Sequence, residues 1–324
     1  MALPLLLAGC AAGTPEAPSR SPVEGQHVIT ETVAAPSLEG NLLGDPAERT
    51  IMVYLPPSYY TSGARYPVVY FLAGYSQAVG TFSVHIASLW GQMQQDGMTE
   101  LIIVEIDGIN SLGGNFYANS PVGGNAEDFL TRDLVSHIDS TYRTIPQASA
   151  RGLSGMSMGG SGTINVGLAN PDVYGSLYAN SPGLLVEDGG LEAFLLSNGN
   201  WLPYGAAFAP DVEAGYPYLR PIDAAAPLEG QDPDLVAAWE SGYGDLRAKI
   251  ADYLAQPARL RAIRVAYGTL DSYPWIPEGS AYFLDLLAEN GIPASEHVFD
   301  GGHTIDSFYF QQDFVEFFSE NLTG

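Results

Sequence analysis

Hydrophobic residues along the chain follow two patterns, one of short continuous runs and one with helical spacing. The segments 67–72 and 101–106 (PVVYFL and LIIVEI) are apolar at almost every position, as expected of strands buried on both faces of a sheet. The segment 27–38 alternates polar and apolar residues and predicts a first strand, and the segment 49–55 predicts a second. Further strands are predicted before Ser157 and at 176–179, 263–267 and 296–299.

Segments with helical spacing separate most of these strands. In the segment 126–142, apolar residues recur every three or four positions and acidic residues occupy the first turn. Helices are also predicted at 81–95, directly after Ser157, at 278–290 and at 307–321. Strands that alternate with helices predict an α/β fold, with a mostly parallel central sheet, right-handed crossovers and helices on both faces.

The segment from Gly183 to Leu260 interrupts this alternation because it is rich in Pro, Gly and large aromatic residues. We interpret it as an insertion after the sixth strand that forms part of a pocket wall. Most of its aromatic side chains are expected to serve ordinary packing. They are Trp201, Tyr204, Phe208, Tyr216, Tyr218, Trp239 and Tyr243.

The segment around Ser157 has the features of a nucleophile elbow, a sharp turn between a strand and a helix. A small apolar run leads into Gly155-Met156-Ser157-Met158-Gly159, and helical spacing follows. The two outer glycines remove Cβ atoms that would clash in so tight a turn, and Gly160 lets the helix approach the strand. The chain contains 37 Gly, so the pattern alone is equally consistent with a structural turn.

A serine hydroxyl becomes a good nucleophile only when a base accepts its proton, and the base needs an acid to orient it. In α/β-hydrolases these residues follow in the order Ser, Asp or Glu, His, each after a strand. Asp271 follows the predicted strand 263–267, and His303 follows the strand 296–299. We therefore predict a catalytic triad of Ser157, Asp271 and His303. Asp300 and Asp306 are alternative acids, whereas His27, His85, His137 and His297 lie before or within predicted elements.

The oxyanion of an ester intermediate needs two backbone N–H donors. Met158 is one candidate because it follows the nucleophile at the start of a helix, where N–H groups lack helical partners. Tyr75 is the other, because it follows Gly74 in the loop after strand 67–72. No cluster has the spacing of metal ligands, and no cofactor is predicted.

Several motifs of the chain resemble the esterase D-type "putative esterase" family. They are Asn119-Ser120-Pro121, Gly124-Asn125, Glu127-Asp128-Phe129, Asp133-Leu134, Ile138-Asp139, Tyr142-Arg143-Thr144 and the run from Gly152 to Gly160. The resemblance is strong over 50–180 and weaker around Asp271 and His303. That family includes feruloyl and acetyl xylan esterases, S-formylglutathione hydrolases and mycobacterial mycolyltransferases. The resemblance implies the α/β-hydrolase fold and ester chemistry at a serine.

Two features depart from the family. Ala73 stands where its members often carry His or Asp, which disfavours a mycolyltransferase, and the insertion 183–260 matches no subfamily. We expect a serine carboxylic-ester hydrolase that forms an acyl-enzyme and acts on small-molecule or polysaccharide-linked esters. The alternatives are an acyltransferase that uses the same triad with a sugar or alcohol acceptor, and a non-catalytic ligand-binding surface lipoprotein. A complete and correctly ordered triad speaks against the lipoprotein.

The segment 1–26 is predicted to be a leader and flexible tether, and residues 27–324 to be the catalytic domain. Leu7-Ala8-Gly9-Cys10 follows an apolar run and resembles a bacterial lipobox, in which the cysteine is lipidated, although the run is short and lacks a basic region. Residues 11–26 have the Pro, Ala, Ser and Gly content of a tether. We expect an exported protein, either secreted or held at a membrane through Cys10. A chance cysteine is the alternative reading. Because Cys10 is the only cysteine, no intrachain disulfide is expected.

Acidic residues far outnumber basic ones. The chain carries 37 Asp and Glu against 12 Lys and Arg, for a formal net charge of −25, and Lys249 is its only lysine. Such a field repels phosphate backbones, which makes nucleic acid an unfavourable partner. An acidic surface with almost no lysine either keeps the protein soluble or indicates adaptation to salt.

If the acidic surface is a salt adaptation, the melting temperature should hold or rise as NaCl is added. The screening length falls from about 30 Å at 0.01 M salt to about 3 Å at 1 M, so repulsion between surface carboxylates is largely removed. Thermal melts and initial rates with a neutral ester, from low salt to molar NaCl, measure this. A melting temperature that falls steadily would show that the carboxylates form favourable pairs, and would contradict the adaptation.

Overall fold

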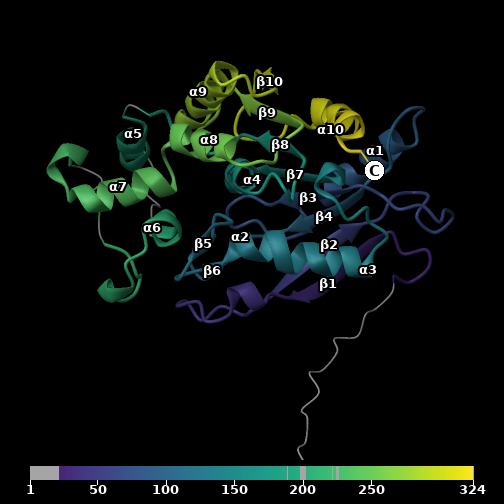
Figure 1. Cartoon of the computed structure of the whole chain (residues 1–324), viewed down its shortest axis with the longest axis horizontal. Helices are drawn as coiled ribbons and strands as arrows, with labels where there is room; N and C mark the ends of the chain where they lie inside the picture. Colours follow the sequence, from purple (N-terminus) through teal and green to yellow (C-terminus); the bar gives the residue numbers. More distant parts are fainter. Residues whose placement is uncertain (1–21, 188, 198–201, 221, 224–225, 324) are drawn as a thin grey trace, which may run out of the picture.

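The computed structural model describes residues 22–187, 189–197, 202–220, 222–223 and 226–323. Cys10, most of the predicted leader and Trp201 lie outside the described residues. The predicted α/β fold is confirmed: an eight-stranded sheet runs through the centre of the molecule in the order β1-β2-β4-β3-β7-β8-β9-β10 (Figure 1). Its strands are β1 (Val28–Ala34), β2 (Glu48–Tyr54), β3 (Val68–Leu72), β4 (Ile102–Ile106), β7 (Arg151–Met156), β8 (Ser176–Asn180), β9 (Ala262–Gly268) and β10 (Ala294–Phe299).

The sheet is mostly parallel, with an antiparallel edge. β2 pairs antiparallel with both β1 and β4, and every pairing from β4 through β10 is parallel. Because parallel strands need a crossover on a sheet face, helices cover both faces, and the central strands are buried at every position. The carboxyl ends of β3, β7, β8, β9 and β10 therefore lie along one edge of the sheet.

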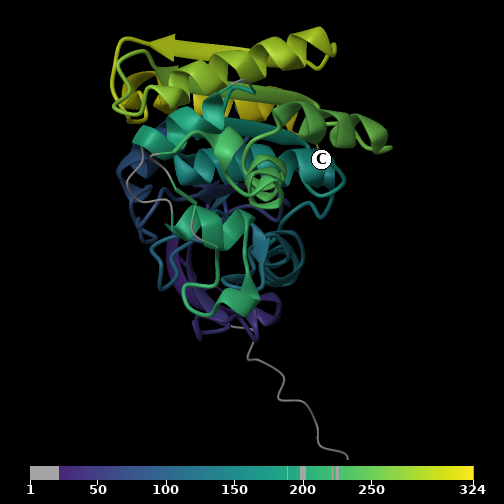
Figure 2. The same ribbon diagram turned by 90° about the vertical axis from the view of Figure 1, so that its left-hand side faces the viewer.

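The two faces of the sheet carry separate cores. Val69, Phe71 and Tyr178 pack toward α1 (Ser83–Met93) and α10 (Ser307–Asn321), which contact each other (Figures 1 and 2). The alternate residues Val68, Tyr70 and Leu72 pack on the opposite face. The helices of that face are α3 (Val135–Thr141), α4 (Met158–Ala169), α8 (Leu246–Ala255) and α9 (Trp275–Glu289). The helix predicted at 307–321 has the bounds of α10.

Three local predictions differ from the structure. The helix predicted at 126–142 is α2 (Ala126–Asp128), a π-helical segment (Phe129–Leu134) and then α3. The first strand ends at Ala34, because Pro36 opens a short 3₁₀ turn. A small hairpin, β5 (Asn119–Ser120) with β6 (Gly124–Asn125), was not predicted, since strands of two residues leave no periodic pattern.

The insertion folds around a core of its own. Its helices are α5 (Gly190–Ser197), α6 (Leu202–Phe208), α7 (Pro233–Gly242) and α8, and the first three stand at the left of Figure 1. Leu191, Phe194 and Trp239 are buried together with Trp275 and Ile276 of α9, which attaches this core to the main body. Tyr216, by contrast, is 72% exposed.

Among the described residues, no helix is both long and apolar enough to cross a membrane.

Candidate active site

Ser157 lies in a strained turn between β7 and α4. Its φ of 58° and ψ of −115° are conformations that residues other than glycine rarely adopt. The turn is tight enough that a Cβ on Gly155 would lie 2.3 Å from the Gly159 carbonyl oxygen. The N–H of Ser157 donates to the Asn180 carbonyl at the end of β8, at 2.9 Å. The serine is thereby fixed at the end of the strand with its side chain half-buried.

Ser157, His303 and Asp271 form a continuous hydrogen-bonded series. His303 Nε2 lies 2.8 Å from Ser157 Oγ, and His303 Nδ1 lies 2.7 Å from Asp271 Oδ2. The Asp271 side chain is fully shielded from solvent, whereas that of His303 is 20% exposed. A carboxylate can only accept from Nδ1–H, so Nε2 is left as the acceptor for the serine proton.

Asp271 is held in place by Tyr273, a residue that the sequence analysis did not identify. The Tyr273 backbone N–H donates to Asp271 Oδ1 at 2.8 Å, so both carboxylate oxygens accept hydrogen bonds. The Tyr273 ring packs edge-on against the His303 imidazole, with 5.1 Å between ring centroids. Tyr273 is 43% exposed and lies beside His303, so its ring is accessible to a molecule bound there.

The competing acids and histidines are engaged elsewhere. Asp306 accepts from the Tyr309 N–H at the start of α10 and lies 3.0 Å from His297 Nε2. Within the described residues, no hydrogen bond joins Asp300 to His303. The remaining histidines also have other neighbours: His27 lies near the Leu55 carbonyl, His85 packs against the rings of Phe82 and Phe310, and His137 pairs with Glu31.

The side chains of the two residues predicted to supply the oxyanion donors border the same glycine. Met158 is the first residue of α4, and Tyr75 lies in the loop after β3. A Cβ on Gly114 would lie 2.6 Å from Met158 Sδ and 2.8 Å from Tyr75 Cδ2, so both residues border the same glycine. A Cβ on Gly74 would lie 3.5 Å from the Met156 carbonyl oxygen, which puts the Tyr75 loop beside the elbow.

Side chains outside the predicted set hold the loop that carries Tyr75. Gln77 Oε1 accepts from the Gly74 N–H at 3.0 Å, and the Tyr117 hydroxyl donates to the Ala73 carbonyl at 2.8 Å. The Tyr75 hydroxyl donates to the Leu112 carbonyl at 2.7 Å. In the sequence, the only sign of these contacts is the Gly113-Gly114 pair, because two glycines without side chains allow another segment to approach their backbone closely.

The buried carboxylate of Glu105 and the half-buried carboxylate of Asp107, at the end of β4, hold the segment 79–82 that continues the Tyr75 loop. Glu105 is fully buried and accepts from the Tyr54 hydroxyl at 2.6 Å and from the Phe82 N–H at 2.9 Å. Asp107 accepts from the Val79 and Ile109 N–H groups, while burial raises the pKa of its carboxyl. These acids serve the backbone of 79–82 rather than the reaction.

The aromatic insertion reaches the helix that begins at the elbow. A Cβ on Gly183 would lie 2.8 Å from the Tyr243 hydroxyl, 2.9 Å from Ser161 Oγ and 3.1 Å from Trp275 Cζ3. Ser161 is one helical turn beyond Ser157, so these rings lie near the nucleophile. Within the described chain, no group of three His, Cys, Asp or Glu side chains could hold a metal ion.

A strained serine on a strand–turn–helix, a histidine and an aspartate after later strands, and a mostly parallel sheet define the α/β-hydrolase fold. Solved structures support this assignment. A ferulic acid esterase superimposes with a TM-score of 0.61 at 21% identity, covering 91% of this chain and 98% of that one. An S-formylglutathione hydrolase from Agrobacterium tumefaciens gives a TM-score of 0.61 at 18% identity, covering 91% and 95%.

Residues 46–320 match the family described as "Putative esterase", and the chain belongs to that family. Among curated proteins, Esterase Rv1288 of Mycobacterium tuberculosis is 25% identical over 279 residues. The match covers 81% of this chain and 54% of the relative, so the chain spans about half the length of the curated protein it matches.

If Asp271 orients His303, replacing it with Asn should lower kcat by a factor on the order of 10⁴, because the amide favours the wrong imidazole tautomer. The fold should survive, since Asn keeps the size of the side chain and can still accept from the Tyr273 N–H. Ester turnover and a thermal melt of the purified variant measure the two effects.

Asp306→Asn is the matched control, because Asn caps helices as well as Asp does and should leave turnover largely unchanged. A large loss of kcat in Asp306→Asn, with none in Asp271→Asn, would assign the acid to Asp306 instead.

Proposed function

We propose that this protein is a serine carboxylic-ester hydrolase that acts through an acyl-enzyme formed on Ser157. The observation that carries the proposal is the unbroken series from Ser157 Oγ through His303 to Asp271, with separations of 2.8 and 2.7 Å. Membership of the esterase family supports the same reaction. The activity is a proposal for the whole protein, because the match covers only 54% of the curated relative.

Acylation begins when Ser157 Oγ attacks the ester carbonyl carbon and its proton passes to His303 Nε2. The imidazolium is stabilised by Asp271, whose carboxylate is shielded from water and therefore interacts strongly. The tetrahedral intermediate collapses when the bond to the alcohol oxygen breaks and His303 gives its proton to that oxygen. Water then attacks the acyl-enzyme, His303 takes a proton from it, and the acid leaves as Ser157 regains its proton.

The negative oxygen of each intermediate would be held by the N–H groups of Met158 and Tyr75. The position of Met158 at the N-terminus of α4 supports its role, because the helix dipole there favours negative charge. The common neighbour Gly114 supports pairing Met158 with Tyr75. Backbone donors explain why an Ala at position 73, in place of the family's His or Asp, is compatible with ester hydrolysis.

For the substrate, we propose an uncharged ester that is either a small molecule or linked to a polysaccharide. The likeness to a ferulic acid esterase supports a polysaccharide-linked ester. The net charge of −25 disfavours anionic substrates. The exposed ring of Tyr273 beside His303 would give the substrate an aromatic wall.

Replacing Ser157 with Ala should abolish turnover of p-nitrophenyl acetate, with a loss of kcat on the order of 10⁶, because no acyl-enzyme can form. The native protein should release a burst of p-nitrophenol when acylation outpaces deacylation. Stopped-flow absorbance measures the burst, and a thermal melt checks the fold of the variant. Native-like turnover in folded Ser157→Ala protein would overturn the mechanism.

Product analysis in the presence of an added alcohol separates hydrolysis from acyl transfer. A hydrolase yields the free acid as its main product. A new ester as the main product would identify the acyltransferase that uses the same triad.

We also propose that the protein is exported and tethered through a lipidated Cys10. The support is the Leu-Ala-Gly-Cys run followed by a segment with the composition of a tether. Mass spectrometry of the protein expressed in its own host should detect more than one acyl chain on Cys10, because a single chain binds membranes only marginally. An unmodified N-terminus retained in the cytoplasm would refute the proposal.

A further inference from the structure

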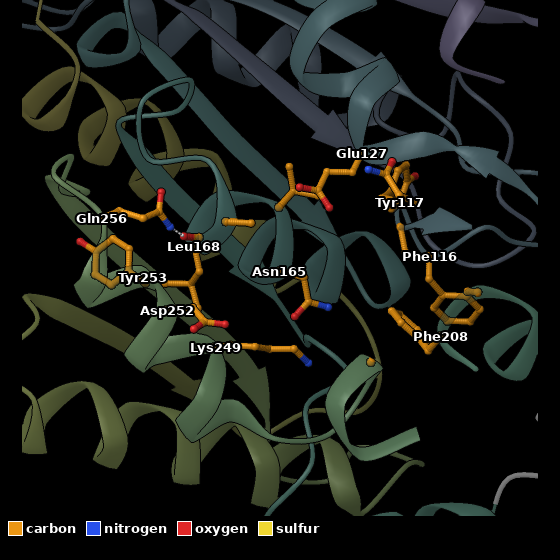
Figure 3. Close-up of a pocket in the computed structure, with 16 residues that line it drawn as sticks. Phe116, Tyr117, Glu127, Asn165, Leu168, Phe208, Lys249, Asp252, Tyr253 and Gln256 are labelled. Carbon is orange, nitrogen blue, oxygen red and sulfur yellow. Dashed lines mark hydrogen bonds between the residues drawn. The ribbon is translucent and has the colours of Figure 1, made fainter. Parts of the chain in front are cut away.

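A second cavity of about 310 Å³ lies beside the far half of α4 (Figure 3). Its walls come from α4, α8, the start of α2, the end of α6 and the segment 116–119. Ser157 precedes α4, whereas the cavity begins at Asn165, which is about 12 Å further along the helix axis. Since the described lining includes none of Ser157, Asp271 and His303, the cavity is separate from the candidate active site.

The cavity contains a polar atom that lacks a partner. Asn165 Oδ1 is buried and, among the described residues, accepts no hydrogen bond. A buried amide oxygen without a partner is unfavourable, so the group favours a ligand or water that donates to it. Figure 3 shows the Asn165 side chain pointing away from α4 into the same space as the Lys249 ammonium group.

Lys249, the only lysine in the chain, forms the opposite wall. Its Nζ donates to the carbonyls of Gly244 at 2.9 Å and Tyr243 at 3.2 Å. An ammonium group has three N–H donors, so the third can serve a ligand oxygen. Burial lowers the pKa of this amine to about 8, which keeps it mostly charged at neutral pH.

Aromatic residues line both ends of the cavity, and two of them lie in a strained stretch of backbone. Phe116 and Tyr117 have φ values of 53° and 56°, which are rare for bulky residues and often occur at functional sites. Phe116 packs against Tyr204 at 4.0 Å and Phe208 at 5.7 Å between ring centroids. Tyr253 lies at the other end of the cavity, beyond Asn165 (Figure 3). Phe116 and Tyr253 are almost fully buried, whereas the half-buried ring of Phe208 offers apolar surface to the cavity.

The charged groups of the lining select against anions, because two carboxylates face one ammonium group. Glu127 and Asp252 would repel an anion, and Lys249 would repel a cation. Burial raises the pKa of the Glu127 carboxyl, whose Oε1 accepts from Asn170 Nδ2 at 2.8 Å. A ligand that both donates and accepts hydrogen bonds without a net charge satisfies all of these groups.

We propose that this cavity binds one ring of a neutral sugar, separately from the ester chemistry at Ser157. Sugar hydroxyls would donate to Asn165 Oδ1 and the Asp252 carboxylate and accept from Lys249 Nζ, while the ring C–H groups pack against the half-buried ring of Phe208. A volume of about 310 Å³ lies at the lower end of the range of about 300–1,000 Å³ for ligand pockets, which fits one ring better than a chain.

The single lysine gives a direct readout of occupancy. In protein labelled with ¹³C at the lysine ε-carbon, Lys249 gives one side-chain NMR signal, which titration with D-xylose or D-glucose should shift saturably. Equal concentrations of glycerol should cause no saturable shift. D-glucuronate, which adds a negative charge, should bind more weakly than D-glucose. The readout needs no ester turnover, so its result is independent of the proposed esterase activity.

Asn165→Leu should weaken sugar binding about tenfold or more, because it removes the unsatisfied acceptor. Asn290→Leu makes the same change at an exposed position outside the cavity and should leave binding unchanged. If Asn165→Leu does not fold, Asp252→Ala replaces it, because Asp252 is exposed and its loss should also weaken binding.

Three results would overturn the proposal. The first is that neither D-xylose nor D-glucose shifts the Lys249 signal saturably. The second is that D-glucuronate binds at least as tightly as D-glucose. The third is that folded Asn165→Leu or Asp252→Ala protein binds the sugar as tightly as the native protein does.

Discussion

The close approach of helix α4 to the sheet is the constraint on which the candidate active site depends. A Cβ on Gly159 would lie 1.9 Å from the Leu72 carbonyl oxygen, and one on Gly160 would lie 2.6 Å from that of Asn180. Only glycine therefore fits where α4 crosses the ends of β3 and β8. This packing keeps Ser157 in a backbone conformation that an isolated peptide would avoid, and the Ser157–Asn180 hydrogen bond fixes it there.

The same approach determines where the other groups must lie. With α4 against the end of β3, the Tyr75 loop has to leave the strand beside the elbow, and Gln77 and Tyr117 hold its backbone. His303 meets Ser157 because β9 and β10 continue the parallel sheet and end at the same edge. The side chains of the site therefore lie on short loops, and the rigid strands before these loops fix their positions.

The parts of the site that could be predicted from the sequence are those with a local signal. The glycines around Ser157 signal a tight turn, and Asp271 and His303 each follow a recognisable apolar strand. The contacts of Gly114 with Met158 and Tyr75, and the hydrogen bond from Tyr117 to Ala73, could not be predicted, because each joins residues that become neighbours only when the chain folds. The bonds from Tyr273 to Asp271 and from Gly74 to Gln77 are local, but their residues form no recognisable motif. The π-helical segment after Asp128 was also missed, since its apolar spacing is close to that of an α-helix.

The segment 113–117 connects the candidate active site with the second cavity. At one end, Gly114 touches both Met158 and Tyr75, and at the other, Phe116 lines the cavity. Tyr117, the next residue, donates from its hydroxyl to the Ala73 carbonyl, one residue before Gly74. Phe116 and Tyr117 are consecutive bulky residues with positive φ, a backbone conformation that is energetically unfavourable for such residues. Contacts on both sides hold this strained conformation, because Tyr117 bonds to the strand end that precedes Tyr75 and Phe116 packs against Tyr204 and Phe208.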